Sequence, residues 1–212
     1  DAKIPDDDNI KALAFLYLYS NKLNLRFMQG NFANGDELVE KIQKRIKKYK
    51  DRIDEHHIMV FYYKIACLYF GDGNNKKCIE FLNKIINNKS LEMREDLMCF
   101  ARILSLVAHY EAGLDYHLDR LVKSTYKFLI KMNDLHEVQK EMIRFLRNLP
   151  EVSPLEIKDE FRKLHTKLKD FEDHPYERRA FLYLDILSWL ESKIENRPVA
   201  DVIAEKVALV SR

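Results

Sequence analysis

Glycine and proline divide this 212-residue chain into long stretches that contain neither residue. A helix interior tolerates these two residues least, so they mark helix ends. Between them, apolar residues recur at helical spacing, as Leu13, Leu16 and Leu23 do, and no run alternates with a period of two for long enough to form a strand. The breakers are Pro5, Gly30, Gly35, Gly71, Gly73, Gly113, Pro150, Pro154, Pro175 and Pro198. The chain is therefore predicted to be all-α.

The breakers and capping residues predict about ten helices. The clearest start is Ser-Pro-Leu-Glu at 153–156, which places a cap, a proline in the first turn and a glutamate three residues after the cap. Asp36 and Asp134 are predicted to open other helices. Short loops group the helices into antiparallel hairpins over approximately residues 10–52, 56–88, 91–131, 134–171 and 175–209. We expect a single helical-repeat domain over residues 1–212, in which the hairpins stack into an αα-superhelix.

Charge and cysteine content exclude several classes of protein. Lys and Arg number 36 against 34 Asp and Glu, so no global field attracts the chain to nucleic acid or an anionic membrane. Cys67, Cys78 and Cys99 are widely spaced within apolar helical patterns, which indicates buried free thiols in a reducing compartment. No apolar run reaches the roughly 20 residues of a membrane span, so a cytoplasmic chain is expected. The chain starts with Asp1 rather than methionine, so a fragment of a longer protein is an expectation left open.

The second hairpin carries a repeat pattern. Its first helix has large, large, small and aromatic residues in order, its turn has a glycine, and its second helix has a small residue followed by two apolar ones. These positions are Tyr62, Ile65, Ala66, Tyr69, Gly73, Cys78, Leu82 and Ile85. The pattern resembles a tetratricopeptide repeat, although Ser90 stands where the family has its terminal proline. The small residues let paired helices approach closely, and the large ones fill the groove between hairpins.

The resemblance is looser elsewhere. The first hairpin fits after a slip of one residue, and the last hairpin matches at Leu184, Leu187 and Ser188 but lacks the glycine. Residues 93–172 match poorly, so another αα-superhelix would serve there as well. The closing run FLYLDILSWLESKIENRPVADVIAEK also looks like the ends of uncharacterised bacterial helical-repeat proteins.

The resemblance implies a binding groove. In tetratricopeptide proteins, the positions matching Tyr63, Cys67 and Phe70 point into a concave surface that receives peptides or helices. Burial of the three side chains by the neighbouring hairpin is the alternative.

A basic helix is the one strongly biased segment. Residues 41–52 hold seven basic residues around the apolar stripe of Ile42, Ile46 and Tyr49. The candidate basic face consists of Lys41, Lys44, Arg45, Lys47 and Lys48. Such a face binds RNA, anionic lipid or an acidic protein segment, unless it is the solvated side of an outer helix.

No catalytic constellation emerges from the remaining polar residues. His136-Glu137 begins like a zinc-protease motif, but Lys140 replaces its second histidine. His109, His117 and Cys99 are the nearest approach to a metal-ligand cluster.

The chain is therefore predicted to be a protein-interaction scaffold, not an enzyme, with no metal or cofactor. Its partner is expected to be a protein or peptide bound in a concave groove, and a homodimer is left open. A sensory or regulatory module of a larger protein, or an RNA-binding helical array that uses residues 41–52, are the alternatives.

Overall fold

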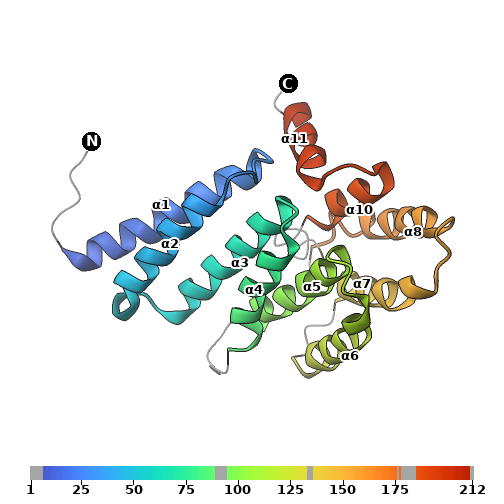
Figure 1. Ribbon diagram of the computed structural model, residues 1–212, viewed down its shortest axis with the longest axis horizontal. Helices are drawn as coiled ribbons and strands as arrows, with labels where there is room; N and C mark the ends of the chain where they lie inside the picture. Colours follow the sequence, from blue (N-terminus) through green and yellow to red (C-terminus); the bar gives the residue numbers. More distant parts are fainter. Residues whose placement is uncertain (1–6, 89–94, 133–135, 176, 178–184, 211–212) are drawn as a thin grey trace.

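The prediction of an all-α chain is confirmed. The computed structural model describes residues 7–88, 95–132, 136–175, 177 and 185–210, and this part of the chain contains ten α-helices and no strand (Figure 1). The helices are α1 (Asp8–Met28), α2 (Asp36–Lys48), α3 (Glu55–Gly71), α4 (Asn75–Ile86), α5 (Glu95–Glu111), α6 (Asp115–Lys131), α7 (Glu137–Asn148), α8 (Ile157–Lys169), α10 (Ile186–Glu195) and α11 (Val199–Val210). Two short 3-10 helices, η1 (Lys50–Arg52) and η2 (Leu149–Glu151), follow α2 and α7.

Short polar side chains begin several helices. At the start of α1, the Asp7 carboxylate accepts a hydrogen bond from the backbone N–H of Asn9, with the two atoms 2.6 Å apart. Asp54 accepts the N–H of His57 at the start of α3, at 2.9 Å. Each carboxylate satisfies an N–H group that has no partner within its own helix. Short polar residues next to apolar helical runs therefore correspond to real helix starts.

One predicted start is wrong. The helix expected from Ser153 begins at Ile157, and residues 154–156 form a turn. The Ser153 hydroxyl accepts the N–H of Leu155, two residues on, at 3.4 Å, whereas a capping box requires the N–H three residues on. The expected starts at 91 and Asp134 lie outside the described residues, as do residues 176 and 178–184 of the helix expected from Pro175. The described helix within that range is α10, which begins at Ile186.

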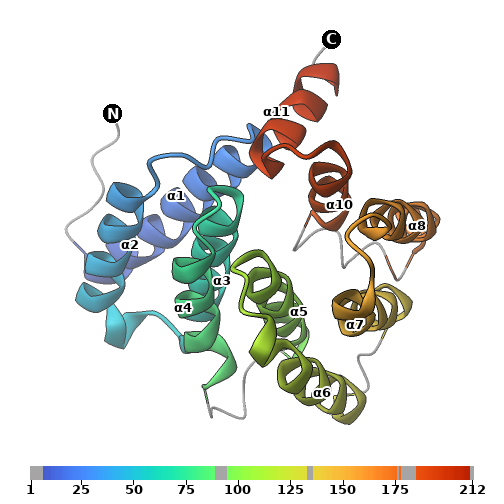
Figure 2. The ribbon, with the colours of Figure 1, turned by 45° about the vertical axis from the view of Figure 1, so that its right-hand side comes forward.

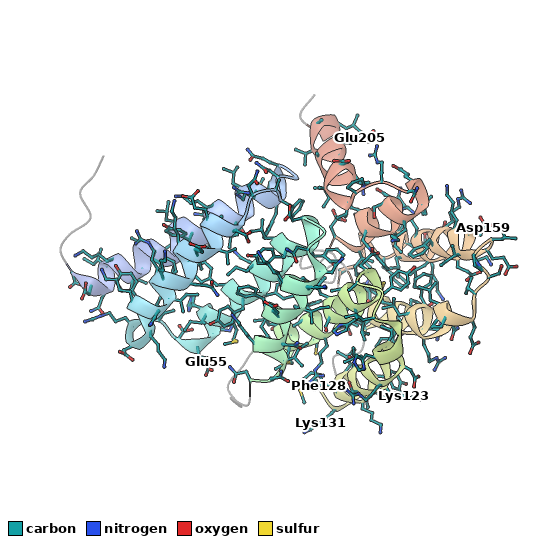
Figure 3. All side chains as sticks on the ribbon, viewed as in Figure 1. Glu55, Lys123, Phe128, Lys131, Asp159 and Glu205 are labelled. Carbon is teal, nitrogen blue, oxygen red and sulfur yellow. The ribbon has the colours of Figure 1, made fainter. Side chains whose placement is uncertain are left out.

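The helices pack mostly against their neighbours in sequence. The contacts run from α3 to α4, α4 to α5, α5 to α6, α6 to α7 and α7 to α8, and α8 also packs closely against α10. Alternate helices also touch: α1 contacts α3, α3 contacts α5, and α5 contacts α7. Side chains fill the spaces between these helices (Figure 3), and their buried members form one hydrophobic core that reaches from Ala12 in α1 to Leu190 in α10.

The loop after α1 connects distant parts of the chain. Phe32 in this loop packs on Gly71 at the end of α3, where an added methyl carbon would lie 2.2 Å from its ring. Gly30 has φ 63° and packs against Ala204 of α11, whose backbone nitrogen would lie 2.7 Å from a methyl carbon on Gly30. Figure 2 shows the helices following an arc from α1 and α2 through α3–α8 to α10, with α11 returning to this loop.

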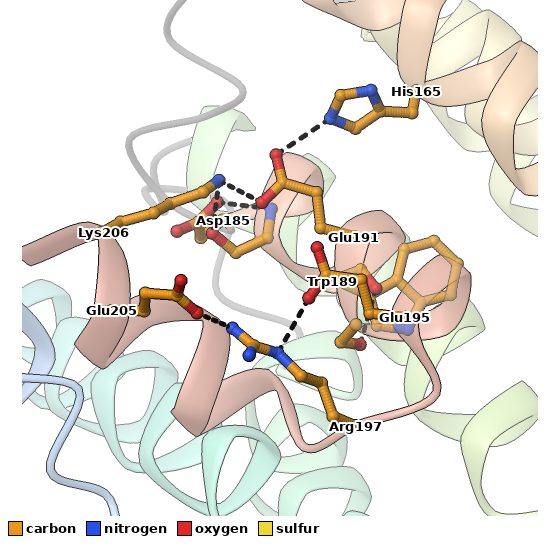
Figure 4. Close-up of polar contacts among 10 residues, drawn as sticks. His165, Asp185, Trp189, Glu191, Glu195, Arg197, Glu205 and Lys206 are labelled. Atoms are coloured by element: carbon orange, nitrogen blue, oxygen red, sulfur yellow. Dashed lines mark hydrogen bonds and ion pairs between the residues drawn. The ribbon is translucent and has the colours of Figure 1, made fainter. Parts of the chain in front are cut away.

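A polar network holds the last helices together (Figure 4). The Glu191 carboxylate of α10 lies 2.9 Å from the His165 ring nitrogen of α8 and 2.7 Å from the Lys206 ammonium of α11. The Trp189 indole N–H donates to Glu111 at the end of α5, at 2.7 Å. Helices α8 and α11 and the end of α5 are therefore fixed around α10.

Candidate interaction surface

The residues expected to line a groove on α3 lie mainly in the core. Tyr63 is 4% exposed and Phe70 is 7% exposed, and Cys67 is half-buried. Burial raises the pKa of the Cys67 thiol to about 12, so it is un-ionised at neutral pH. This arrangement corresponds to the alternative in which neighbouring helices cover these side chains.

The basic face on α2 is exposed as a group but engaged within the chain. Lys41 pairs with Glu37, and Lys44 lies 3.7 Å from Glu40. Arg45 stacks over the Tyr19 ring of α1, with its guanidinium carbon 5.2 Å from the ring centroid. Lys48 lies over Tyr49, and Lys47 is exposed. The local carboxylates and rings therefore moderate the field that this face presents.

Helix α1 has two apolar faces. Its inner face buries Ala12, Phe15, Tyr19 and Leu23. Its outer face exposes six large apolar side chains, which are 42–71% exposed: Ile10, Leu13, Tyr17, Leu18, Leu25 and Met28. Ten large apolar side chains are exposed in the described part of the chain, and α1 carries these six. A surface helix of a folded domain normally turns a polar face to water, so this concentration indicates an interaction surface.

The side chains of the outer face spread over about 140° around the helix axis. Each residue of a helix is rotated by about 100° from the last, so Ile10, Tyr17 and Met28 point within about 20° of each other. Leu13 lies about 60° to one side of Ile10, and Leu25 and Leu18 lie about 60° and 80° to the other. The stripe extends about 27 Å along the helix axis. Asn21 and Asn24 are exposed polar residues within it.

Aromatic and polar contacts hold α1 in place from behind. The ring of Phe15 stacks on Phe61 of α3, with centroids 5.2 Å apart. Lys64 of α3 donates to the Ser20 hydroxyl at 2.5 Å and to Asn24 at 2.9 Å. Burial lowers the pKa of Lys64, and these two acceptors replace part of the water it has lost. The outer face is thus presented on a rigid helix.

A cleft of about 650 Å³ lies between the loop after α1, the turn after α3 and the α10–α11 connection. Three of its charged side chains are paired, since Lys193 lies 3.1 Å from Glu111 and Arg197 pairs with Glu205.

The polar residues singled out in the sequence serve as caps and local partners. His136 is the N-cap of α7, and its N–H donates to Gln139 at 3.0 Å. The His109 ring lies 2.6 Å from the Ser105 carbonyl oxygen, to which it donates. Within the described residues, no group of three or more His, Cys, Asp or Glu side chains could hold a metal ion. Among the described helices, none is both long and apolar enough to cross a membrane.

The sequence contained a signal for the outer face. Leu13 shares helical spacing with Leu16 and Leu23, yet it is 53% exposed. Residues 10–19 contain a single charged residue, Lys11, so the first half of the helix is apolar on more than one face, a pattern that predicts burial on more than one side. No family model, curated protein or solved structure matches this chain. The surface must therefore be interpreted from its own chemistry.

Proposed function

We propose that this chain is a protein-interaction scaffold and that the outer face of α1 is its binding surface. The observation that carries the proposal is the row of six exposed large apolar side chains on one helix. Such a row matches the way an amphipathic helix binds a partner, through apolar anchors at three- and four-residue spacing. Tyr17 is 71% exposed and supplies an aromatic anchor of the kind that contributes most to binding.

We also propose a tetratricopeptide-like arrangement of the helices, which would suit this function. Alternate helices touch along the chain, as they do when hairpins stack side by side. Ala66 and Cys78, which match the small positions of the repeat, are both 0% exposed. The ring of Phe81 packs between Tyr62 and Tyr69, with centroids 5.8 Å from each. In an array of this kind, the outer face belongs to the first helix of the first hairpin.

The test changes the outer face without changing the core. Tyr17→Lys combined with Leu25→Lys places two charges within the stripe, and both side chains are more than half exposed. Tyr126→Lys combined with Ile130→Lys on α6 is the matched control, because these side chains are 45% and 53% exposed. The tagged full chain and both variants are used to co-purify bound proteins from the native cell, with quantification by mass spectrometry.

We expect the α1 variant to lose at least about 90% of its specific partners, because a charge in an apolar interface centre is strongly unfavourable. The α6 control should retain them, and both variants should keep a wild-type circular dichroism spectrum. Equal capture by the wild type and the α1 variant would show that the outer face is not the binding surface.

A further inference from the structure

We infer that the occupant of the outer face of α1 is a second copy of this chain, docked as an antiparallel pair of α1 helices about a two-fold axis. This inference rests on the proposed function, since it names the partner of the same surface.

The area suits a dimer. Six large side chains that are 42–71% exposed together offer on the order of 600 Å² of apolar surface, the upper end for a patch on a monomer. A standard interface buries about 800 Å² on each partner. The polar residues that border the stripe, such as Lys11 and Lys22, supply the remainder as a rim.

The dipoles of α1 favour an antiparallel pair. Antiparallel docking opposes the two helix dipoles, whereas parallel docking places their like ends together. The charged side chains of α1 leave the outer face apolar, because they are engaged on the other side of the helix: Asp8 lies 3.8 Å from Arg52, Lys22 lies over the Tyr19 ring, and Arg26 donates to the Ala33 carbonyl at 2.8 Å.

The stripe also matches itself when reversed. Antiparallel docking that buries the whole stripe sets Ile10 at the level of Met28 in the second copy, and the converse contact follows from the two-fold axis. Leu13 then lies at the level of Leu25 in the second copy. Tyr17 and Asn21 lie close to the axis, where the phenol hydroxyl and the amide of opposite copies come within reach of each other. Every large side chain of the outer face is covered in this arrangement.

Sedimentation equilibrium of the purified full chain tests the partner. The wild type is expected to be a dimer at micromolar concentration, as is the Tyr126→Lys, Ile130→Lys control. The Tyr17→Lys, Leu25→Lys variant should raise the dissociation constant by at least about 100-fold, because the lysines of both copies meet in the interface. A wild type that remains a monomer at 100 times that concentration, or an α1 variant that dimerises as the wild type does, overturns the inference.

Single cysteines test the orientation without disrupting the interface. Asn21→Cys lies near the axis, so two copies should be linked by a short bismaleimide at least about ten times faster than two copies of Ile10→Cys, whose cysteines lie about 27 Å apart along the axis. Wild type, with Cys67, Cys78 and Cys99, is the background control. Equal linking of both variants indicates a parallel pair and overturns the arrangement.

The two proposals fail separately. If the wild type is a monomer but its outer face still captures proteins that the α1 variant loses, the surface is a binding site for another protein and the second-copy inference is wrong. If neither self-association nor capture depends on the outer face, the proposed function fails with it.

Discussion

Phe32 occupies the space that a methyl group on Gly71 would need. The ring is 6% exposed and stacks on Phe27 with centroids 6.0 Å apart, so it has no free direction in which to move. The contact fixes the loop after α1 on the end of α3. A glycine in the last turn of a helix therefore serves here as a packing surface, in addition to ending the helix.

Gly71→Ala should destabilise the chain by about 1–3 kcal/mol, because overpacking outweighs the gain in helix propensity of about 1 kcal/mol. Phe32→Leu removes part of the ring, so adding Gly71→Ala to that variant should cost less than adding it to wild type. Urea denaturation of the four chains measures the coupling. Additive effects of the two substitutions would show that Phe32 does not limit the space at Gly71.

Single residues differ in how far the sequence predicted them. Ala66 and Cys78 were assigned to close helix packing, and both are fully buried. The sequence could not distinguish a groove face of α3 from a core face, because Tyr63 and Tyr69 are both large and aromatic. Both are buried in the structure. A helix that is apolar all round gives no periodic signal of which side meets a partner and which side meets another helix.

Helix α10 is held by a carboxylate that bonds to two other helices. Burial alone would raise the pKa of Glu191, but the hydrogen bonds from Lys206 and His165 outweigh it and place the pKa below its usual value of 4.5. A carboxylate with a lowered folded pKa stabilises the fold above its unfolded pKa. That contribution is lost as the pH falls through the folded pKa.

Glu191→Gln should therefore lower Tm at neutral pH. The loss in free energy of unfolding should not exceed about 1 kcal/mol, because solvent screens these partly exposed ion pairs. The difference from wild type should shrink below pH 4.5, where the carboxylate of the unfolded chain takes up a proton. Thermal melts between neutral and acidic pH measure this, with Glu172→Gln on the exposed turn after α8 as a control. A Tm difference between Glu191→Gln and wild type that stays constant down to acidic pH would show that the ionised Glu191 carboxylate does not stabilise the fold.

The sequence predicted elements better than their ends. Glycines and short polar caps gave the helix number and most boundaries, because both act on local backbone geometry. The start of α7 combines a local cap at His136 with a distant one, since the N–H groups of Glu137 and Val138 donate to Glu177, about forty residues later, at 3.0 and 3.1 Å. The outer face of α1 was missed for a related reason, because only the packed structure shows which apolar side remains uncovered.

At the scale of the whole molecule, the last helix returns to the first loop. Gly30 lies against the backbone of Ala204, although 174 residues separate them, and this contact joins the ends of the arc in Figure 2. A contact of such long sequence separation has no local signature. Hairpins could stack as predicted whether or not α11 contacted the loop after α1, so the predicted stacking does not imply this contact.

The final prediction tests whether this contact holds α11 in place. Gly30→Ala adds a methyl carbon 2.7 Å from the Ala204 nitrogen, and it also strains a backbone with φ 63°. Gly113→Ala is the matched control, because its φ is 67° and nothing lies within 4 Å of the added carbon. Both variants carry a similar backbone penalty of about 1–2 kcal/mol, so they separate the strain from the collision. Hydrogen exchange measured by mass spectrometry separates the two effects. Gly30→Ala should speed amide exchange in α11 and in residues 30–33 several-fold more than Gly113→Ala does. Gly30→Ala should leave exchange in α5 and α6 unchanged. Equal acceleration in α11 by both substitutions would mean that α11 responds to global stability and that its contact with the first loop does not hold it.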